Sequence, residues 1–370
     1  MQESQYDEQK FWVALSTHPK IGARTLTKLY KRFRLMSKVW SASRQSLMEA
    51  GLDLAQVEAV FEVIAKIDPI KEMEKLNRLK INVLILSDKN YPPILAEIAD
   101  PPAILYIKGE ILPEDELSIG VVGSRKYTNY GERAVEKFVG PLAQNKLTII
   151  SGLALGIDTL AHKMALQAGG RTLAVLGCGL DQIYPSSNVH LADKILQGHG
   201  AIISEFPLGT PAYRSNFPMR NRIIAGLSLG TLVVEGAVDS GSLITARAAL
   251  DYNREVFAVP GSIFSETSEG PNRLIQMGAK IVLEAKDILN ELNIDSSLEE
   301  KEAQLIIADT PEEKILLELL KSPMLVDELI KESKLGPPLV NTTLIMLEMK
   351  GAVSNLGGTR YVIKGKLKEN

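Results

Sequence analysis

The chain has 370 residues and a mass of 40.5 kDa, which exceeds the usual size of one domain and favours two or three. With 45% hydrophobic and 24% charged residues it is not a largely disordered chain, and its net charge of −3 excludes a protein that is basic all over. The single cysteine, Cys178, cannot form an internal disulfide, the N-terminus does not resemble a secretion signal, and no apolar run reaches membrane-spanning length. We therefore expect a cytoplasmic protein without membrane insertion.

The first 75 residues predict a small helical domain. Helical patterns at residues 9–17 and 23–33 flank a hairpin with the sequence HPKIG, where glycine can turn the chain and expose backbone N–H groups. This pattern resembles a helix-hairpin-helix or SAM-like domain, and such hairpins resemble non-specific binders of DNA backbones. A plain helical bundle with a solvated basic face is the alternative. The candidate second DNA site comprises Lys20, Gly22, Arg24 and Lys28.

The central part of the chain predicts a doubly wound α/β domain over residues 76–291. Two apolar runs within residues 68–118 predict lead-in strands or a linker. Strand-like runs then alternate with helix-like segments, which predicts a mostly parallel sheet. These runs cover residues 120–122, 148–150, 173–176, 201–204, 231–234, 256–259 and 280–283.

The C-terminal part predicts a separate small domain. An acidic linker is expected at residues 292–309, and the sequence TPEE at residues 310–313 is typical of a helix start. Three short helices, followed by a hairpin that turns at Gly357-Gly358, resemble a winged helix over residues 310–370. The third helix carries one basic residue, Lys350, which favours a protein-contact or regulatory role over specific DNA binding.

Small residues follow several predicted strands and indicate a phosphate site. Ligands of such sheets bind outside the carboxyl ends of the strands, where Gly123-Ser124 and Ser151-Gly152 lie. Glycine allows close approach to the backbone, and the next helix offers unpaired N–H groups to an anion. Arg125 adds a charge that can grip a phosphate through two hydrogen bonds. Ser240-Gly241-Ser242 lies at the start of a later predicted helix. These residues could serve as a helix cap or as a phosphate contact, and the sequence does not decide between the two roles.

The strongest pattern is RSNFPMRNRIIAG, which begins at Arg214 and lies between two predicted strands. Arginines surround Phe217 in this segment. Cations can bind a phosphate backbone and an aromatic ring can stack on a base, and this combination suits single-stranded nucleic acid. Arg220 and Arg222 are two residues apart and cannot share one helix face. One of them is therefore expected to pair internally, with Glu205 or Glu235 as the partner.

The sequence offers little for catalysis. Asp158 and His162 stand four apart on one predicted helix, which is more typical of a capping acid and a packed histidine than of a catalytic pair. Cys178 lies between two glycines at a strand end and is expected to be a small buried residue rather than a nucleophile. The sequence has no metal-spacing motif and no GxxxxGK[ST] loop. We expect no catalytic residue, no metal and no cofactor.

A family resemblance rests on segments within about residues 80–290, namely GVVGSR, ISGLALGIDTLAH, LGCGLDQIYPSSN, ISEFPLGTPAYRSNFPMRNRIIAGLS, VVEGAVDSGSLITARAAL and FAVPGS…GPNRLIQMGA. These segments resemble the DNA-processing protein A (DprA/Smf) family. The resemblance implies an extended Rossmann-like domain that binds single-stranded DNA and helps load the RecA recombinase during natural transformation, in a protein that is not an enzyme. It also implies a homodimer through this domain and DNA contacts that include Arg125, Gly152, Arg214 and Phe217. Some members carry lysine where this chain has Ser186 and Arg214, so one phosphate contact is lost and the other keeps its charge.

The predicted DNA interface combines the strand ends with the segment that begins at Arg214. It comprises Gly123, Ser124, Arg125, Gly152, Gly156, Arg214, Phe217, Arg220, Asn221, Arg222, Ser240, Gly241 and Ser242. The rival is a Rossmann-like enzyme that resembles nucleoside-monophosphate phosphoribohydrolases, which carry a catalytic glutamate in a PGGxGTxxE loop. The corresponding place here reads VVEGAVDSGSLITA and lacks that loop. A nucleotide-sensing module without DNA is a third possibility.

Overall fold

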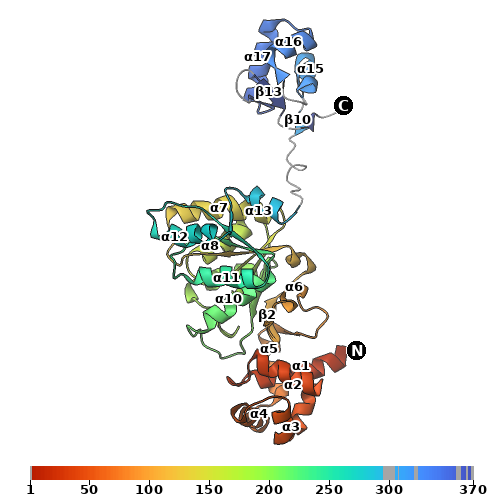
Figure 1. The fold of residues 1–370 in the computed structure, drawn as a ribbon. Coiled ribbons are helices and arrows are strands. Elements are labelled where there is room, and N and C mark those ends of the chain that lie inside the picture. The colour runs from red at the N-terminus through yellow and green to blue at the C-terminus, as the bar shows by residue number, and fades with distance from the viewer. Residues whose placement is uncertain are drawn as a thin grey trace. The chain divides into compact units, whose positions relative to one another are not determined.

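The computed structural model describes residues 2–294, 305–306, 308–320, 324–355, 360–363 and 366–367 (Figure 1). The chain divides into two compact units, Met1–Ile294 and Asp295–Asn370. Residues 295–304 of the expected acidic linker, and the predicted hairpin turn at Gly357-Gly358, lie outside the described residues. Within the described part of the chain, no helix is long and apolar enough to cross a membrane.

The first unit begins with the predicted helical segment. Its helices are α1 (Gln2–Ser16), α2 (Ala23–Phe33), η1 (Met36–Ser41), α3 (Arg44–Glu49), α4 (Leu54–Lys66) and α5 (Pro69–Arg78). The amide of Gln9 donates to the carbonyl of Val83 at 3.2 Å, and the hydroxyls of Ser16 and Tyr106 are 2.6 Å apart. Buried side chains of the helices and of the first strands form one continuous cluster. The helical segment and the sheet therefore share a core within one compact unit.

The described residues of the first unit form a nine-stranded sheet in the order β1-β2-β6-β5-β4-β3-β7-β8-β9. The strands are β1 (Ile81–Ile85), β2 (Ile104–Gly109), β3 (Ser118–Val122), β4 (Thr148–Ser151), β5 (Thr172–Leu176), β6 (Gly200–Ser204), β7 (Gly230–Val233), β8 (Glu255–Ala258) and β9 (Lys280–Ile281). β2 pairs antiparallel with β1 and with β6, and the other neighbouring pairs are parallel. The two apolar runs before residue 118 are thus strands of the sheet, and the predicted mostly parallel architecture is confirmed.

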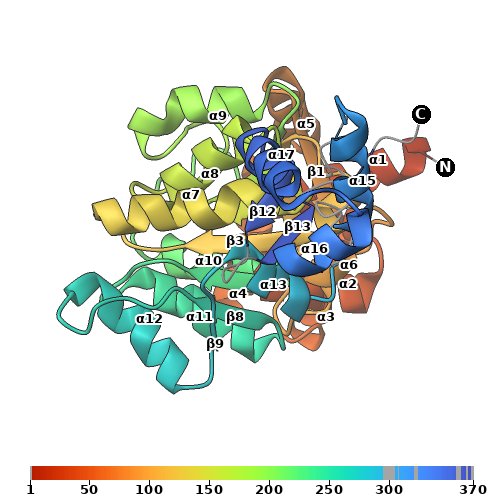
Figure 2. The same ribbon diagram turned by 90° about the horizontal axis from the view of Figure 1, so that it is seen from above.

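Helices cover both faces of this sheet. One face carries α7 (Asn129–Gln144), α8 (Ile157–Gln167), α9 (Val189–Ile195) and α13 (Ala285–Glu291), and the other carries α6 (Pro93–Ala96), α10 (Asn216–Leu227), α11 (Gly241–Asp251) and α12 (Glu266–Gln276). Figure 2 shows α7, α8 and α9 side by side. In β5, Leu173 and Val175 join the core on the α10 side, while Ala174 and Leu176 join the core on the opposite face. Burial on both faces explains why this strand is a continuous apolar run.

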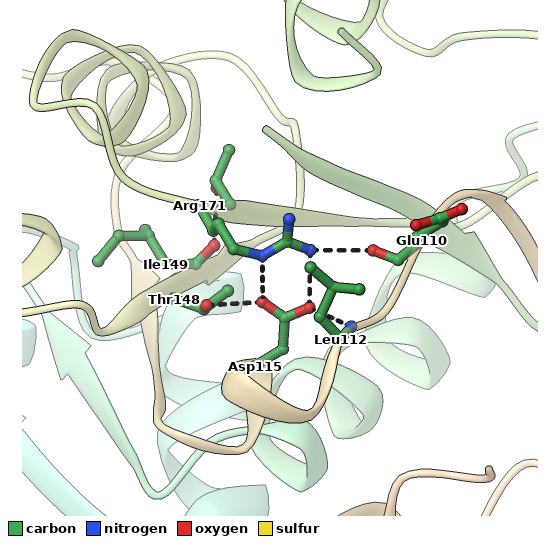
Figure 3. A network of polar contacts seen from close by, with 7 residues as sticks. Glu110, Leu112, Asp115, Thr148, Ile149 and Arg171 are labelled. Atoms are coloured by element: carbon green, nitrogen blue, oxygen red, sulfur yellow. Dashed lines mark hydrogen bonds and ion pairs between the residues drawn. The ribbon is translucent and has the colours of Figure 1, made fainter. Parts of the chain in front are cut away.

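An ion pair braces the amino ends of the central strands (Figure 3). Arg171, just before β5, donates from Nε to Asp115 Oδ1 at 2.8 Å and from Nη2 to Oδ2 at 2.9 Å. Asp115 lies in η2 (Pro113–Glu116), and it also accepts from the hydroxyl of Thr148 at 2.7 Å. Nη2 of Arg171 donates as well to the carbonyl of Glu110 at 3.0 Å. This two-pronged pair ties the connection between β2 and β3 to the start of β4 and β5.

The second unit has the predicted winged-helix elements. They are α15 (Pro311–Leu319), α16 (Val326–Ser333) and α17 (Pro337–Met349), a sheet of β11 (Met324–Leu325), β13 (Arg360–Ile363) and β12 (Val353–Asn355), and a pair of β10 (Leu305–Ile306) with β14 (Lys366–Leu367). Thr310 caps α15 by accepting from the Glu313 backbone N–H. The ammonium of Lys350 lies 2.6 Å from carboxylate oxygens of both Asp309 and Glu313. The one cation expected at the third helix is therefore engaged within the unit.

Candidate nucleic-acid interface

The strand order reverses at β3, which pairs with β4 on one side and with β7 on the other. In open α/β sheets ligands bind outside the carboxyl ends of the strands at such a switch point. The predicted turn Gly123-Ser124-Arg125 follows β3 directly. The topology therefore places this turn where the fold is suited to hold a ligand.

Packing against Gly156 holds the Arg125 turn in place. Gly156 has φ of +86°, and a Cβ at this residue would lie 2.1 Å from the carbonyl oxygen of Ser124. The Ile157 N–H donates to the same carbonyl at 3.1 Å, and Ser124 Oγ bonds to both backbone groups of Lys126. Only glycine fits such a position without strain. Gly156 thus acts as support for the turn, and the Arg125 side chain is left exposed.

Arg125 lies beside two aromatic rings. Its guanidinium carbon is 5.4 Å from the centroid of the Phe217 ring, a cation–π contact. The Phe217 ring is in turn 5.7 Å from the ring of Tyr184, which is 47% exposed. We call these three residues the cation–aromatic cluster. The structure brings two predicted residues together here and adds Tyr184, which the sequence reasoning missed although an aromatic residue in the loop after a buried strand was a usable signal.

Arg214 is exposed on a loop that leads into α10. Asn216, two residues on, is 7% exposed and donates from Nδ2 to the carbonyls of Gly177 at 3.0 Å and Pro211 at 3.3 Å. The exposed ring of Tyr213 precedes Arg214 directly. A buried amide thus fixes the loop that presents this cation.

Arg220 points into the protein. It is 4% exposed, and its guanidinium donates to the carbonyls of Gly152 at 2.6 Å and of Val175, while Nε donates to the side chain of Asn221 at 3.1 Å. Burial lowers the pKa of Arg220 to about 10, and the charge of Asp158 partly offsets this, so the group is cationic at neutral pH. This placement disfavours the predicted direct contact of Arg220 with DNA. Its donors support the carboxyl ends of β4 and β5 from inside.

Gly152 belongs to the same support. A Cβ at this residue would lie 2.4 Å from a guanidinium nitrogen of Arg220, and the Gly152 N–H donates to the buried carboxylate of Asp158 at 3.1 Å. Gly152 itself is buried, which argues against the predicted contact with DNA. Gly123 is likewise packed, because a Cβ there would lie 2.6 Å from Ile157.

Two of the three groups considered for catalysis, His162 and Cys178, are buried and uncharged at neutral pH. His162 has no exposed surface, its Nδ1 lies 2.6 Å from the hydroxyl of Thr172, and burial lowers its pKa to about 3. Burial raises the pKa of the Cys178 thiol to about 11. The predictions of a packed histidine and of a buried small residue at Cys178 are confirmed.

Arg222 forms an ion pair with Glu205 and lies 3.5 Å from a carboxylate oxygen of Asp100. The prediction that one of the two arginines pairs internally with Glu205 is confirmed. Arg222 is thus engaged within the protein, which disfavours a contact with DNA, and its assignment as a DNA contact stays a prediction. Asn221 is 9% exposed and donates to the carbonyl of Gly241 at 3.1 Å, which links α10 to the start of α11.

Ser240-Gly241-Ser242 caps α11. Ser240 accepts from the N–H of Ser242 at 3.3 Å, and Ser242 is 6% exposed. Gly241 is exposed, with open space in front of it. Capping is therefore confirmed, and phosphate contact at Gly241 stays a prediction.

A carboxylate already faces the first turn of α7. Glu235 is 1% exposed and accepts from the N–H and hydroxyl of Thr128 at 3.0 and 2.5 Å and from the hydroxyl of Thr267 at 3.2 Å. A Cβ at Gly131 would lie 2.2 Å from this carboxylate. A helix start of this kind holds the phosphate in dinucleotide-binding folds. In this protein the buried carboxylate of Glu235 lies at that helix start and holds Thr128 and Thr267 instead of leaving room for a phosphate. The arrangement therefore disfavours the rival nucleotide enzyme.

The candidate second site lies apart in the sequence, on the hairpin between α1 and α2 and on α2 itself. Lys20, Gly22, Arg24 and Lys28 are all exposed. The ammonium of Lys28 also donates to the carbonyl of Gly51 at 2.7 Å.

Comparisons with known proteins agree with this architecture. A family model described as DNA recombination-mediator protein A matches residues 82–293, and one described as DprA winged helix domain matches residues 299–359. The protein Smf of Synechocystis sp. is 33% identical over 392 residues, which cover 96% of this chain and 98% of that protein. The X-ray structure of DNA processing protein A from Streptococcus pneumoniae is 36% identical, covers 77% of this chain and 97% of its own, and has a TM-score of 0.66. A structure concerned with the single-stranded DNA binding mode of DNA processing protein A from Helicobacter pylori is 30% identical, covers 58% of this chain and 97% of its own, and has a TM-score of 0.53. The chain therefore belongs to the DNA recombination-mediator protein A family.

Proposed function

We propose that this protein binds single-stranded DNA at the carboxyl edge of its sheet, protects incoming DNA and loads the RecA recombinase onto it during natural transformation. The observation that carries the proposal is the cation–aromatic cluster of Arg125, Tyr184 and Phe217, with Arg214 exposed on the loop before Phe217. Cations can hold successive phosphates while rings stack on bases, and this combination suits a flexible single strand better than a stacked duplex. The Helicobacter pylori relative, described for its single-stranded DNA binding, supports the same ligand.

The proposal includes no catalytic step. Two acids at this edge, Glu235 and Asp158, are buried and accept hydrogen bonds from the chain itself, so neither is free to act as a base. We place this activity in the cytoplasm, where the thiol of Cys178 would stay reduced.

The test is the dependence of binding on strand length. Fluorescence anisotropy at one fixed salt concentration would compare thymidine monophosphate, oligothymidines of increasing length and a duplex of matched length. We expect affinity to rise with length and to favour the single strand. Equal affinity for the mononucleotide and a long oligothymidine would refute the proposal. Faster assembly of RecA on the oligothymidine when this protein is added would test the loading step separately.

We further propose that the chain forms a homodimer through the first unit. Apolar side chains in the loop after β8 and on both sides of β9 are strongly exposed: Ile263 by 80%, Phe264 by 93%, Met277 by 70% and Leu283 by 61%. Ile263 and Met277 line one hollow of the surface. Large exposed apolar side chains that gather on one surface indicate an interaction site. Sedimentation of the parent chain and of Met277→Arg tests this, with a dimer expected for the parent and a monomer for the variant. A parent chain that is monomeric at micromolar concentration would contradict it.

A further inference from the structure

The exposed face of α2 carries a row of cations. Arg24, Lys28 and Lys31 are four and three residues apart, so they share one face of the helix, and Lys20 precedes them in the hairpin. The opposite face of α2 is buried, which turns the row toward solvent. We call Lys20, Arg24, Lys28 and Lys31 the α2 row.

The charge of this row is not compensated by neighbouring acids. The sequence contains no Asp or Glu between Lys10 and Arg44. The acids of α3 and α4 that form ion pairs do so with other cations: Glu49 with Arg32, Glu58 with Arg44, and Glu62 with Lys66 and His18. In the part of the chain that the structure describes, no ion pair reaches Lys20, Arg24 or Lys31. The row is therefore a local basic surface on a chain whose net charge is −3.

The backbone under this row is well anchored. Ile21 in the hairpin is 2% exposed, and its N–H donates to the carbonyl of His18 at 2.8 Å. The bond from the Lys28 ammonium to the Gly51 carbonyl fixes the middle of the row to the turn before α4. The backbone that carries these cations is thus fixed on a folded surface, so a ligand does not have to order it on binding.

We propose that the α2 row is a second contact for DNA, which binds the phosphate backbone without reading bases. Arg24 and Lys31 are separated by about 10 Å along the helix, a length over which one strand of B-form DNA carries about three phosphates. The two rings of this helix are not offered as base platforms, because Tyr30 and Phe33 both pack against the hydrophobic core of the first unit and Tyr30 also lies 5.2 Å from Trp12. The inference rests on the proposed function, since it takes DNA held at the sheet edge as the polymer that also reaches α2.

The test compares a short with a long oligothymidine on the full chain. The variant is Lys20→Gln, Arg24→Gln, Lys31→Gln, and the matched control removes three exposed cations from α5 by Lys71→Gln, Lys75→Gln, Arg78→Gln. For the long oligothymidine, we expect the slope of log affinity against log salt to fall by about 2 in the α2 variant, because each phosphate contact on a single strand contributes about 0.7. The short oligothymidine and the α5 control should keep the parent values. Replacing Lys20 and Lys31 by arginine should keep the parent slope.

Each contrary result has a distinct meaning. If the α2 variant binds the long oligothymidine with the same salt slope and affinity as the parent, the second contact is refuted and the proposed site at the sheet edge is unaffected. Equal losses on both oligothymidines, or an equal loss in the α5 control, would also overturn it, since the cations would then act only through net charge. Binding of labelled polyglutamate to the parent but not to the α2 variant, together with a parent slope for the long oligothymidine in that variant, would overturn the DNA contact and assign the row to an acidic protein. Failure of the parent to bind either oligothymidine would refute the proposed function itself.

Discussion

The two ends of the central strands use arginine in opposite ways. At the amino ends, Arg171 is paired through two hydrogen bonds with the buried carboxylate of Asp115. At the carboxyl end of β3, Arg125 is exposed, and the contact that the structure records for its guanidinium is the ring of Phe217. Arg220 lies buried below that edge, and its guanidinium donates hydrogen bonds to backbone carbonyls. An arginine in this sheet is thus available to a ligand only where the protein leaves its charge uncompensated.

The largest expected effect comes from breaking the amino-end pair. Asp115→Ala leaves Arg171 without its partner and removes the acceptor of Thr148. Because Arg171 is half-buried, we expect a loss of about 3 kcal/mol of unfolding free energy, the low end for a broken buried pair. Urea unfolding followed by circular dichroism measures this, with the exposed neighbour Glu116→Ala as the control, expected within about 0.5 kcal/mol of the parent. DNA affinity of the folded variant should not change. An affinity loss at a temperature where the variant is folded would remove the distinction between the two edges.

The converse change is Arg125→Ala at the carboxyl edge. Loss of a charge-assisted contact with phosphate should weaken binding by about 1.5–3 kcal/mol while the unfolding free energy stays within about 0.5 kcal/mol. The exposed Arg133→Ala on α7 is the control with the same charge change. Gel-shift titration should also show a larger loss for Arg125→Ala than for removal of residues 310–370. The reverse ranking would move the main DNA site out of the first unit.

The two rings of the cation–aromatic cluster are also expected to contribute to binding at the carboxyl edge. Phe217→Ala should weaken binding to oligothymidine by about 1–3 kcal/mol, and Tyr184→Ala should cost an amount near the lower end of that range, as expected for one lost stack each. Anisotropy titration of both variants decides this. An unchanged affinity for Phe217→Ala would show that the ring is only a packing residue and that Arg125 rests on it without a base platform.

The smallest effect concerns His162, which packs on Thr172 at the start of β5. Its pKa is about 3 in the folded protein, against about 6.5 in the unfolded chain, so below pH 6.5 the unfolded state takes up a proton that the folded state refuses. This contribution to stability is fully present above about pH 6.5 and is lost as the pH falls toward 3. Between pH 7 and 6 the loss should stay below about 1 kcal/mol. In His162→Gln the unfolding free energy should depend less on pH over this window, and a parent-like dependence would contradict the assignment.

Much of the fold was predictable because it follows from local patterns. Runs such as residues 173–176 are apolar throughout because both faces of a parallel strand are covered. Such a run can be recognised in the sequence without knowing which strands lie next to it. The capping of α11 by Ser240 and the start of α15 at Thr310 are equally local. The exposed residues Arg125 and Arg214 were found because a cation directly after a strand, or beside an aromatic residue, has few structural uses.

Other features depend on residues that are distant in the sequence. Asp115 and Arg171 are separated by 56 positions, and Arg220 and Gly152 by 68, so neither pairing leaves a local pattern. Arg125 and Arg220 carry the same side chain, and only the packing of α10 against β4 and β5 decides that one is exposed and the other is buried. The sequence by itself determined the element order, the strand ends and the residue types of the site. The tertiary structure decided which cations stay free, because the compensation of a charge depends on which atoms surround it.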